Sequence, residues 1–240
     1  MEYRREVESV NTVSTSLTQG TLLDEMATPV RTDRTRPSRS RRAPKVSGDE
    51  RERAILATFE RLLEGHSLHE ISIDDIARGA GISRPAFYFY FASKEAVLLS
   101  LFERMIAEAV ATRGDALERV AEDPEARIRQ SLTAFYDVFR EHRAVTLAGA
   151  EAQATSVEVR ELWAAVMETW VQEAAVAIEA ERLRGAAPAG VPARDLAISL
   201  LLMNERVQHT SFAGHEPAVP EESVVDVLVA IWMGAIYGCS

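Results

Sequence analysis

The sequence is short of cysteine and of long apolar segments. Cys239 is the single cysteine, which excludes an intramolecular disulfide and makes a reducing compartment the simplest expectation. The longest apolar run, residues 227–237, is about half of the roughly 20 residues that a membrane-spanning helix needs. The first residues show no apolar signal-peptide core. We therefore expect a soluble cytoplasmic protein with no membrane partner.

Motifs for catalysis and metal binding are also missing. There is no nucleophile elbow, no phosphate-binding glycine loop and no HExxH motif, and among five histidines only His66 and His69 have a spacing that metal ligands use. Glu205 and His209 stand one helical turn apart and could form an acid–base couple, but a surface or pocket contact explains such a pair more often. We expect no enzyme, no catalytic residue, no metal and no cofactor.

What the sequence does contain is helical periodicity, with abundant alanine and only 7% aromatic residues. No segment alternates in the manner of a strand, so we predict an all-α fold. Proline and glycine separate the apolar stripes, and they set the helix ends. The expected helices span about residues 47–65, 72–80, 83–92, 93–119, 124–141, 144–154, 157–183, 194–212 and 220–237.

Residues 72–94, SIDDIARGAGISRPAFYFYFASK, are the most informative stretch. Ser72 and Ser83 stand where two short helices need N-cap residues, and glycines at 79 and 81 supply the turn between them. Phe87 and Phe91 are expected to face the core, which leaves Arg84 and Tyr88 outward. This pattern predicts a helix-turn-helix, although an ordinary helical hairpin produces a similar one.

The amino-acid sequence of this stretch resembles the DNA-binding segment of TetR-type transcriptional repressors. The resemblance is specific over residues 52–101, where it includes SIDDIA, AGIS and FYFYFASKEAVL. It continues into the C-terminal half, where ATSVEV, ELW, LMNER and SFAG are similar to the subgroup that includes the mycobacterial repressor of ethionamide activation. The resemblance implies an N-terminal three-helix helix-turn-helix DNA-binding domain and a C-terminal helical domain for ligand binding and dimerisation.

We accordingly expect three regions: residues 1–46 as a disordered basic arm, residues 47–93 as the DNA-binding domain, and residues 94–240 as the ligand-binding and dimerisation domain. Residues 31–45 hold seven basic side chains and one acidic one. Such a run can simply keep a chain soluble, but its place just before a DNA-binding domain favours a DNA-gripping arm. The net charge of −10 belongs mostly to residues 95–240, which carry twelve basic and twenty-three acidic side chains.

The expected DNA contacts lie on and around the second helix of the motif. Arg84 in its first turn has a guanidinium that fits the O6 and N7 atoms of guanine. Pro85 and Ala86 offer apolar surface for a thymine methyl, and the tyrosine hydroxyls can reach phosphate. For Tyr90, packing alone is the alternative. The full set expected to face double-stranded operator DNA is Ser72, Ser83, Arg84, Pro85, Ala86, Tyr88, Tyr90 and Lys94.

The expected ligand site is a set of large side chains on inward faces of the C-terminal helices. Such a set usually means core, but tryptophan, methionine and a buried amide also suit a pocket wall. In the resembling subgroup the matching positions line an apolar tunnel, which implies a small hydrophobic effector for Phe135, Phe139, Trp163, Met167, Trp170, Asn204 and Trp232. The chain departs from that pattern at Ile128, Glu173, Leu201 and His209.

The function expected from these features is a repressor that binds a palindromic operator as a homodimer and leaves it when a small apolar ligand binds. We expect the last two helices to form the dimer interface, because Val224, Val225, Leu228, Val229 and Ile231 exceed what one core face needs. The alternative from another class is a helical scaffold or adaptor without specific DNA binding.

Overall fold

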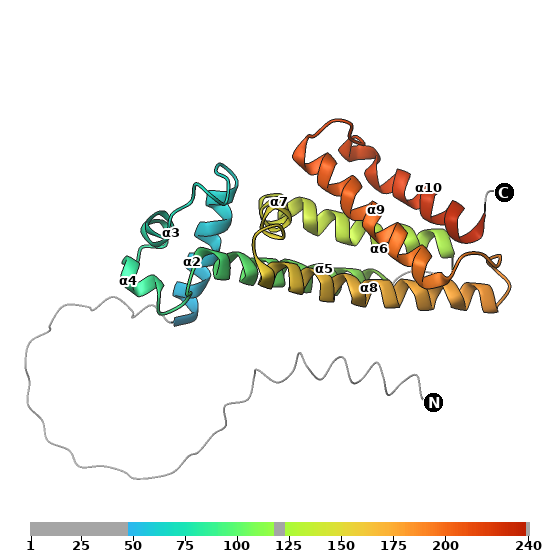
Figure 1. Ribbon diagram of the computed structural model, residues 1–240, viewed down its shortest axis with the longest axis horizontal. Coiled ribbons are helices and arrows are strands. Elements are labelled where there is room, and N and C mark those ends of the chain that lie inside the picture. Colours follow the sequence, from blue (N-terminus) through green and yellow to red (C-terminus); the bar gives the residue numbers. More distant parts are fainter. Residues whose placement is uncertain (1–47, 118–122, 239–240) are drawn as a thin grey trace, which may run out of the picture. The chain divides into compact units, whose positions relative to one another are not determined.

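The computed structural model describes residues 48–117 and 123–238, and within these ranges all regular secondary structure is helical (Figure 1). The helices are α2 (Gly48–Leu63), α3 (Ile73–Gly79), α4 (Arg84–Phe87), α5 (Lys94–Leu117), α6 (Pro124–Glu141), α7 (Arg143–Ala152), α8 (Val157–Leu183), α9 (Ala193–Ala213) and α10 (Val224–Tyr237), with a 3₁₀ turn η1 (Glu221–Ser223) before α10. The expected arm at residues 1–46 and the expected first helix residue, 47, lie outside the described residues. No described helix is both long and apolar enough to cross a membrane.

The N-terminal helices α2, α3 and α4 form a head that is built on one apolar centre. Ile55 and Phe59 of α2, Ile76 of α3 and Phe87 of α4 are all fully buried, and Leu98 of α5 joins them. The long helix α5 therefore starts inside the core of the head and continues into the body. This continuity connects the two parts through a rigid element.

The turn between α3 and α4 has the chemistry that the sequence predicts. The Ser72 hydroxyl accepts a hydrogen bond from the Asp75 amide, and the Asp75 carboxylate accepts one from the Ser72 amide, which is a capping box. The Ser83 hydroxyl caps α4 by accepting a hydrogen bond from the Ala86 amide, without a reciprocal contact. Gly81 has a φ of 67°, which is the left-handed conformation that glycine tolerates best.

The second helix of the motif is shorter than the sequence predicts. Helix α4 ends at Phe87, and residues 88–90 form turns, so Phe87 and Phe91 do not lie on one continuous helix. Both rings are nevertheless buried, at 6.2 Å between centroids. Tertiary packing of the aromatic side chains outweighs the helical periodicity of this segment.

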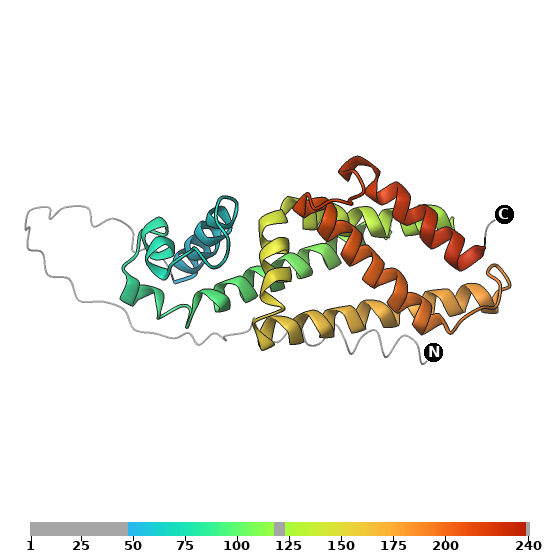
Figure 2. The ribbon, with the colours of Figure 1, turned by 45° about the horizontal axis from the view of Figure 1, so that its top comes forward.

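The body consists of α5 to α10, with α9 running obliquely between α8 and α10 (Figure 2). Helix α7 stands at the end of the body that packs on α2 (Figures 1 and 2). Gly149 allows α7 to approach α5 closely, because a Cβ at this position would lie 2.7 Å from the Phe102 ring. Helix α7 is thus pressed against α5 on one side and against the head on another.

The interface expected on α10 needs a correction. Val224, Leu228 and Val229 are between 0% and 2% exposed, so they belong to the core of their own chain. The apolar excess in this helix reflects burial against α6 and α9 on two sides. Among the named residues, Ile231 remains exposed.

The close approach of α3 to α2 gives the first prediction. A Cβ on Gly79 would lie 2.4 Å from Cγ2 of Thr58, a buried β-branched side chain with little freedom to move. We expect Gly79→Ala to lower the free energy of unfolding by about 1–3 kcal/mol. Chemical denaturation of the full chain measures it.

Gly114→Ala in α5 is the matched control, because no atom of the described residues outside its chain neighbours and its own helix backbone lies within 4 Å of the added methyl group. This change should raise stability by up to about 1 kcal/mol through helix propensity. A Gly79→Ala protein as stable as the wild type would contradict the packing described for α2 and α3.

Candidate functional site

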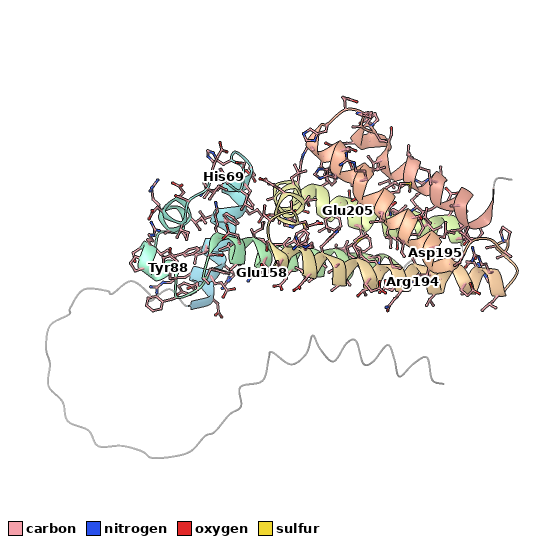
Figure 3. The ribbon with its side chains drawn as sticks, viewed as in Figure 1. His69, Tyr88, Glu158, Arg194, Asp195 and Glu205 are labelled. Carbon is pink, nitrogen blue, oxygen red and sulfur yellow. The ribbon has the colours of Figure 1, made fainter. Side chains whose placement is uncertain are left out.

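Helix α4 and the residues next to it carry polar and aromatic side chains that are exposed to solvent. Tyr88 follows α4 directly and is 48% exposed (Figure 3), and Phe89 is 87% exposed. Arg84, Pro85 and Ser83 are exposed, while Ala86 is half-buried. The predicted residues of the helix and its cap therefore share one accessible surface.

Arg84 is held in place by groups of the same head. Its guanidinium donates to the Asp74 carboxylate at 2.8 Å, with both side chains about half exposed. Hydrogen bonding with Tyr88 and the charge of Asp74 raise the pKa of Arg84, so it is charged at any physiological pH. An exposed pair of this kind exchanges partners easily, because screening by water leaves it weak. The guanidinium is therefore available to a stronger acceptor.

Two predicted DNA contacts occupy less accessible positions. The Lys94 ammonium donates to the backbone carbonyls of Leu68, Ile71 and His69 at 2.7, 2.9 and 3.3 Å, which uses all three of its donors. Its role in this structure is to tie the loop before α3 to the start of α5, and we leave it out of the DNA contacts proposed below. Tyr90 is half-buried against the core of the head.

The body contains a cavity of about 700 Å³ between α5, α6, α7, α8 and α9, and this cavity is partly open to solvent. Six of the seven side chains predicted for the ligand site line it, and they come from three helices: Phe135, Phe139, Trp163, Met167, Trp170 and Asn204. The seventh, Trp232, lines a neighbouring cavity of about 280 Å³. Both cavities share Leu132, Phe135, Trp170, Leu201 and Asn204 as wall residues.

The apolar part of the larger cavity is an aromatic cluster around Trp163. The rings of Phe102, Trp170 and Phe139 lie 5.5, 5.7 and 6.4 Å from it between centroids. Phe135 extends the cluster, at 4.7 Å from Trp170. Edge-on and tilted contacts of this kind fix the orientation of the rings. The parts of these rings that are not used in ring–ring contacts line the cavity.

Polar side chains enter the cavity wall from α9. The Asn204 side chain is buried and accepts a hydrogen bond from the Trp232 indole at 3.0 Å, which explains its place in an apolar helix face. Glu205 lies among the helices of the body (Figure 3), and burial raises its pKa although Trp163 and Gln153 act in the opposite direction. Burial lowers the pKa of His209, whose Nδ1 atom is buried without a hydrogen-bond partner among the described residues.

The positions that depart from the resembling subgroup also lie around the two cavities. Leu201 lines both, His209 lines the larger one, and Ile128 and Glu173 line the smaller one. Glu173 forms an ion pair with Arg113, whose guanidinium lies over the Phe135 ring at 5.3 Å. The charge of Glu173 in the wall of the smaller cavity is therefore balanced by Arg113.

Sequence reasoning missed the walls that α5 and α7 provide. Phe102 of α5 and Thr146, Leu147 and Ala150 of α7 line the larger cavity. Their apolar residues have the same spacing as those of a helix packed in a core, so no sequence signal distinguishes a cavity-lining helix from a core helix. Phe89 was missed for a related reason, since it stands among aromatic residues that otherwise face inward.

A histidine connects the head to the body beside α7. The His142 imidazole contacts the Glu60 carboxylate of α2 through Nδ1 and the Glu108 carboxylate of α5 through Nε2. Leu147 lies next to both the larger cavity and the space between α2 and α7. The helix that forms part of the cavity wall therefore also forms the contact with the head.

The head, with its exposed α4 face, and the helical body define a helix-turn-helix protein of the class that regulates transcription. Two family models match the chain: bacterial regulatory proteins of the tetR family over residues 55–101, and the C-terminal domain of transcriptional regulator EthR over residues 128–238. The chain belongs to the TetR family of transcriptional regulators and, within it, to the EthR type. This places it among regulators rather than enzymes.

Full-length relatives support this assignment. The HTH-type transcriptional regulator EthR of Mycobacterium tuberculosis strain H37Rv is 53% identical over 205 residues, which cover 83% of this chain and 93% of the relative. The EthR protein of Mycolicibacterium smegmatis is 50% identical over 204 residues, with 85% and 94% covered. A solved TetR-family regulator from Syntrophomonas wolfei superposes with a TM-score of 0.64 over 79% of this chain and 97% of its own, at 18% identity.

The His142 contacts predict a pH-dependent link between head and body. Burial opposes a charge on this imidazole, but Glu60 and Glu108 outweigh it and raise its pKa above the ordinary value. A raised pKa means that the stabilisation is complete below about pH 6.5 and is lost as pH rises through the folded-state pKa. We expect the melting temperature of the wild type to lose its advantage over His142→Gln as pH rises above about 6.5.

The control is the same comparison in a protein that carries Glu60→Gln and Glu108→Gln. Without the two carboxylates the difference between histidine and glutamine should no longer fall as pH rises. A wild-type advantage that stays constant across this pH range would show that the three side chains do not act as a charged link.

Proposed function

We propose that this protein is a repressor that binds an operator as a homodimer and is released when a small, largely apolar ligand occupies the cavity of the body. The observation that carries the proposal is the double role of α7. Its side chains form one wall of a cavity of about 700 Å³, and the same helix packs on α2 of the head. A ligand that moves this wall therefore acts on the helix against which the DNA-binding head rests.

The proposed DNA contacts are the accessible residues of the α4 region. Arg84 reads a guanine edge, Pro85 and Ala86 lie against a thymine methyl, and Tyr88 contacts phosphate. Ser72 and Ser83, both exposed, contact phosphate at the starts of α3 and α4. The acidic body belongs on the side away from the duplex.

A single head offers too small a surface for selective binding, so the proposal requires two copies. The support for a dimer interface is the outer face of α10, where Ala230, Ile231 and Ala235 are exposed. Small apolar side chains of this kind allow two helices to approach closely. A two-fold pair of heads then fits half-sites separated by about 34 Å or a multiple, which corresponds to a near-palindrome.

The mechanism that follows is a shift between two head spacings. Ligand in the cavity displaces α7 and α5, and the heads no longer match successive major grooves. The shift in population between the two head spacings is limited by the ratio of the ligand's affinities for them. A shift from 1:99 to 99:1 requires an affinity ratio of about 10⁴. The proposed regions are residues 47–93 for DNA binding and 94–240 for ligand binding and dimerisation, in the cytoplasm.

The proposal is tested by selecting genomic fragments that bind the full chain, and then by screening hydrophobic compounds for release of the selected fragment. A compound that raises the melting temperature of the protein should also lower the affinity for the fragment. Compounds that stabilise the protein and leave the DNA affinity unchanged would rule out the release mechanism. Absence of any preferred fragment would favour a scaffold protein.

Arg84 gives a residue-specific prediction. Replacing Arg84 by alanine removes a bidentate base contact, so discrimination at one base pair of each half-site should fall by about 1–3 kcal/mol. Binding to a set of single-base operator variants measures this change. Preference at the other positions should persist.

Arg140→Ala is the matched control, because Arg140 is 54% exposed and pairs with Asp137 at 3.1 Å, much as Arg84 pairs with Asp74. It lies on α6 of the body, so its loss should leave operator binding unchanged. An Arg84→Ala protein that loses affinity equally for all sequences would assign Arg84 to phosphate binding instead of base reading.

A further inference from the structure

We propose that the ligand of the larger cavity is a cationic amphiphile, with an apolar body against the aromatic cluster and a protonated amine beside the Glu205 carboxyl group. This inference rests on the proposed function, since it specifies the chemical class of ligand for the same cavity. It goes further because it assigns a binding role to an ionisable side chain. The proposal follows from three features of the wall.

The first feature is the number of ring faces and edges around one residue. Trp163 contacts Phe102, Phe139 and Trp170, and all four rings line the cavity. The negative faces of aromatic rings attract a cation, and a desolvated site strengthens the attraction. An aliphatic wall would accept an apolar body equally well, but it would give no such preference for positive charge.

The second feature is the position of Glu205 at this cluster. Its side chain is partly buried, which raises the pKa of its carboxyl group, and the nearby side chains of Trp163 and Gln153 act in the opposite direction as potential partners of the carboxylate. A carboxylate can accept about four hydrogen bonds, so two partners leave room for N–H donors of a ligand. A buried carboxylate without a cation is costly, and an ammonium group in the cavity removes that cost.

The third feature is the charge of the remaining wall. Burial keeps the pKa of His209 low, so its imidazole is neutral at pH 7. Glu151 and Arg206 line the same wall, but both side chains are exposed, so water screens their opposite charges. The ionisable groups that face the cavity are Glu151, Glu205, Arg206, His209 and His215.

A carboxylate ligand would face the Glu205 carboxylate and be repelled, and a neutral alcohol would leave this partly buried carboxyl group uncompensated. An amine with an apolar chain satisfies both the rings and the acid. Its affinity should fall as pH is lowered, because protonation of Glu205 removes the partner charge and protonation of His209 adds a repulsive one. The amine itself stays protonated up to about pH 10.

The test uses decylamine, 1-decanol and decanoate, which share a chain and differ in the head group. Calorimetric titration of the full chain near pH 7, below micelle concentrations, should show decylamine binding about tenfold tighter than 1-decanol, with decanoate weakest. Glu205→Gln should bind 1-decanol as before and lose the preference for decylamine. Glu161→Gln, which changes an exposed carboxylate of α8 outside the cavity, should behave as the wild type.

The outcomes separate this inference from the proposed function. Binding of 1-decanol with no preference for decylamine, or a preference that persists in Glu205→Gln, overturns the amine inference and leaves an apolar ligand site in place. Preferred binding of decanoate also overturns it. If none of the three compounds binds the wild type, the ligand cavity itself is wrong, and both proposals fail.

Discussion

The structure depends on the close packing of α7 against the Phe102 side chain of α5. Gly149 makes this contact possible, since any larger residue would place its Cβ 2.7 Å from the ring. Because the Phe102 ring lines the larger cavity and α7 packs on α2, the cavity and the head both contact α7. Packed interiors transmit displacement because they have few voids to absorb it. One contact thus serves both the stability of the body and its connection to the head.

The sequence predicted those parts of the fold that local chemistry decides. Ser72, Ser83 and Gly81 occupy the cap and turn positions expected of them, because caps and left-handed turns depend on one or two residues. The predicted ligand-site residues on α6, α8 and α9 do line a cavity, since large side chains at helical spacing share one face. The all-α fold followed from the helical periodicity, and the family followed from the resemblance of the sequence motifs.

What the sequence could not predict depends on contacts between distant segments. Lys94 was expected at a phosphate, yet its ammonium is taken by three carbonyls that lie 23 to 26 residues earlier in the chain. Val224, Leu228 and Val229 were expected at an interface, yet α6 and α9 cover them within one chain. The contribution of α7 to the cavity could not be predicted either. The spacing of apolar residues is the same in a helix that packs in a core and in a helix that lines a cavity.

The central claim is that occupancy of the cavity changes the spacing of two heads, and one distance measurement tests it most directly. A spin label on Arg78→Cys, an exposed site on α3, in a Cys239→Ser protein reports the separation of the heads by pulsed electron paramagnetic resonance. The account predicts one narrow distance with operator DNA and a longer distance when a cavity ligand is added. A distance that is the same with and without ligand, or the absence of any coupling between labels, would contradict it.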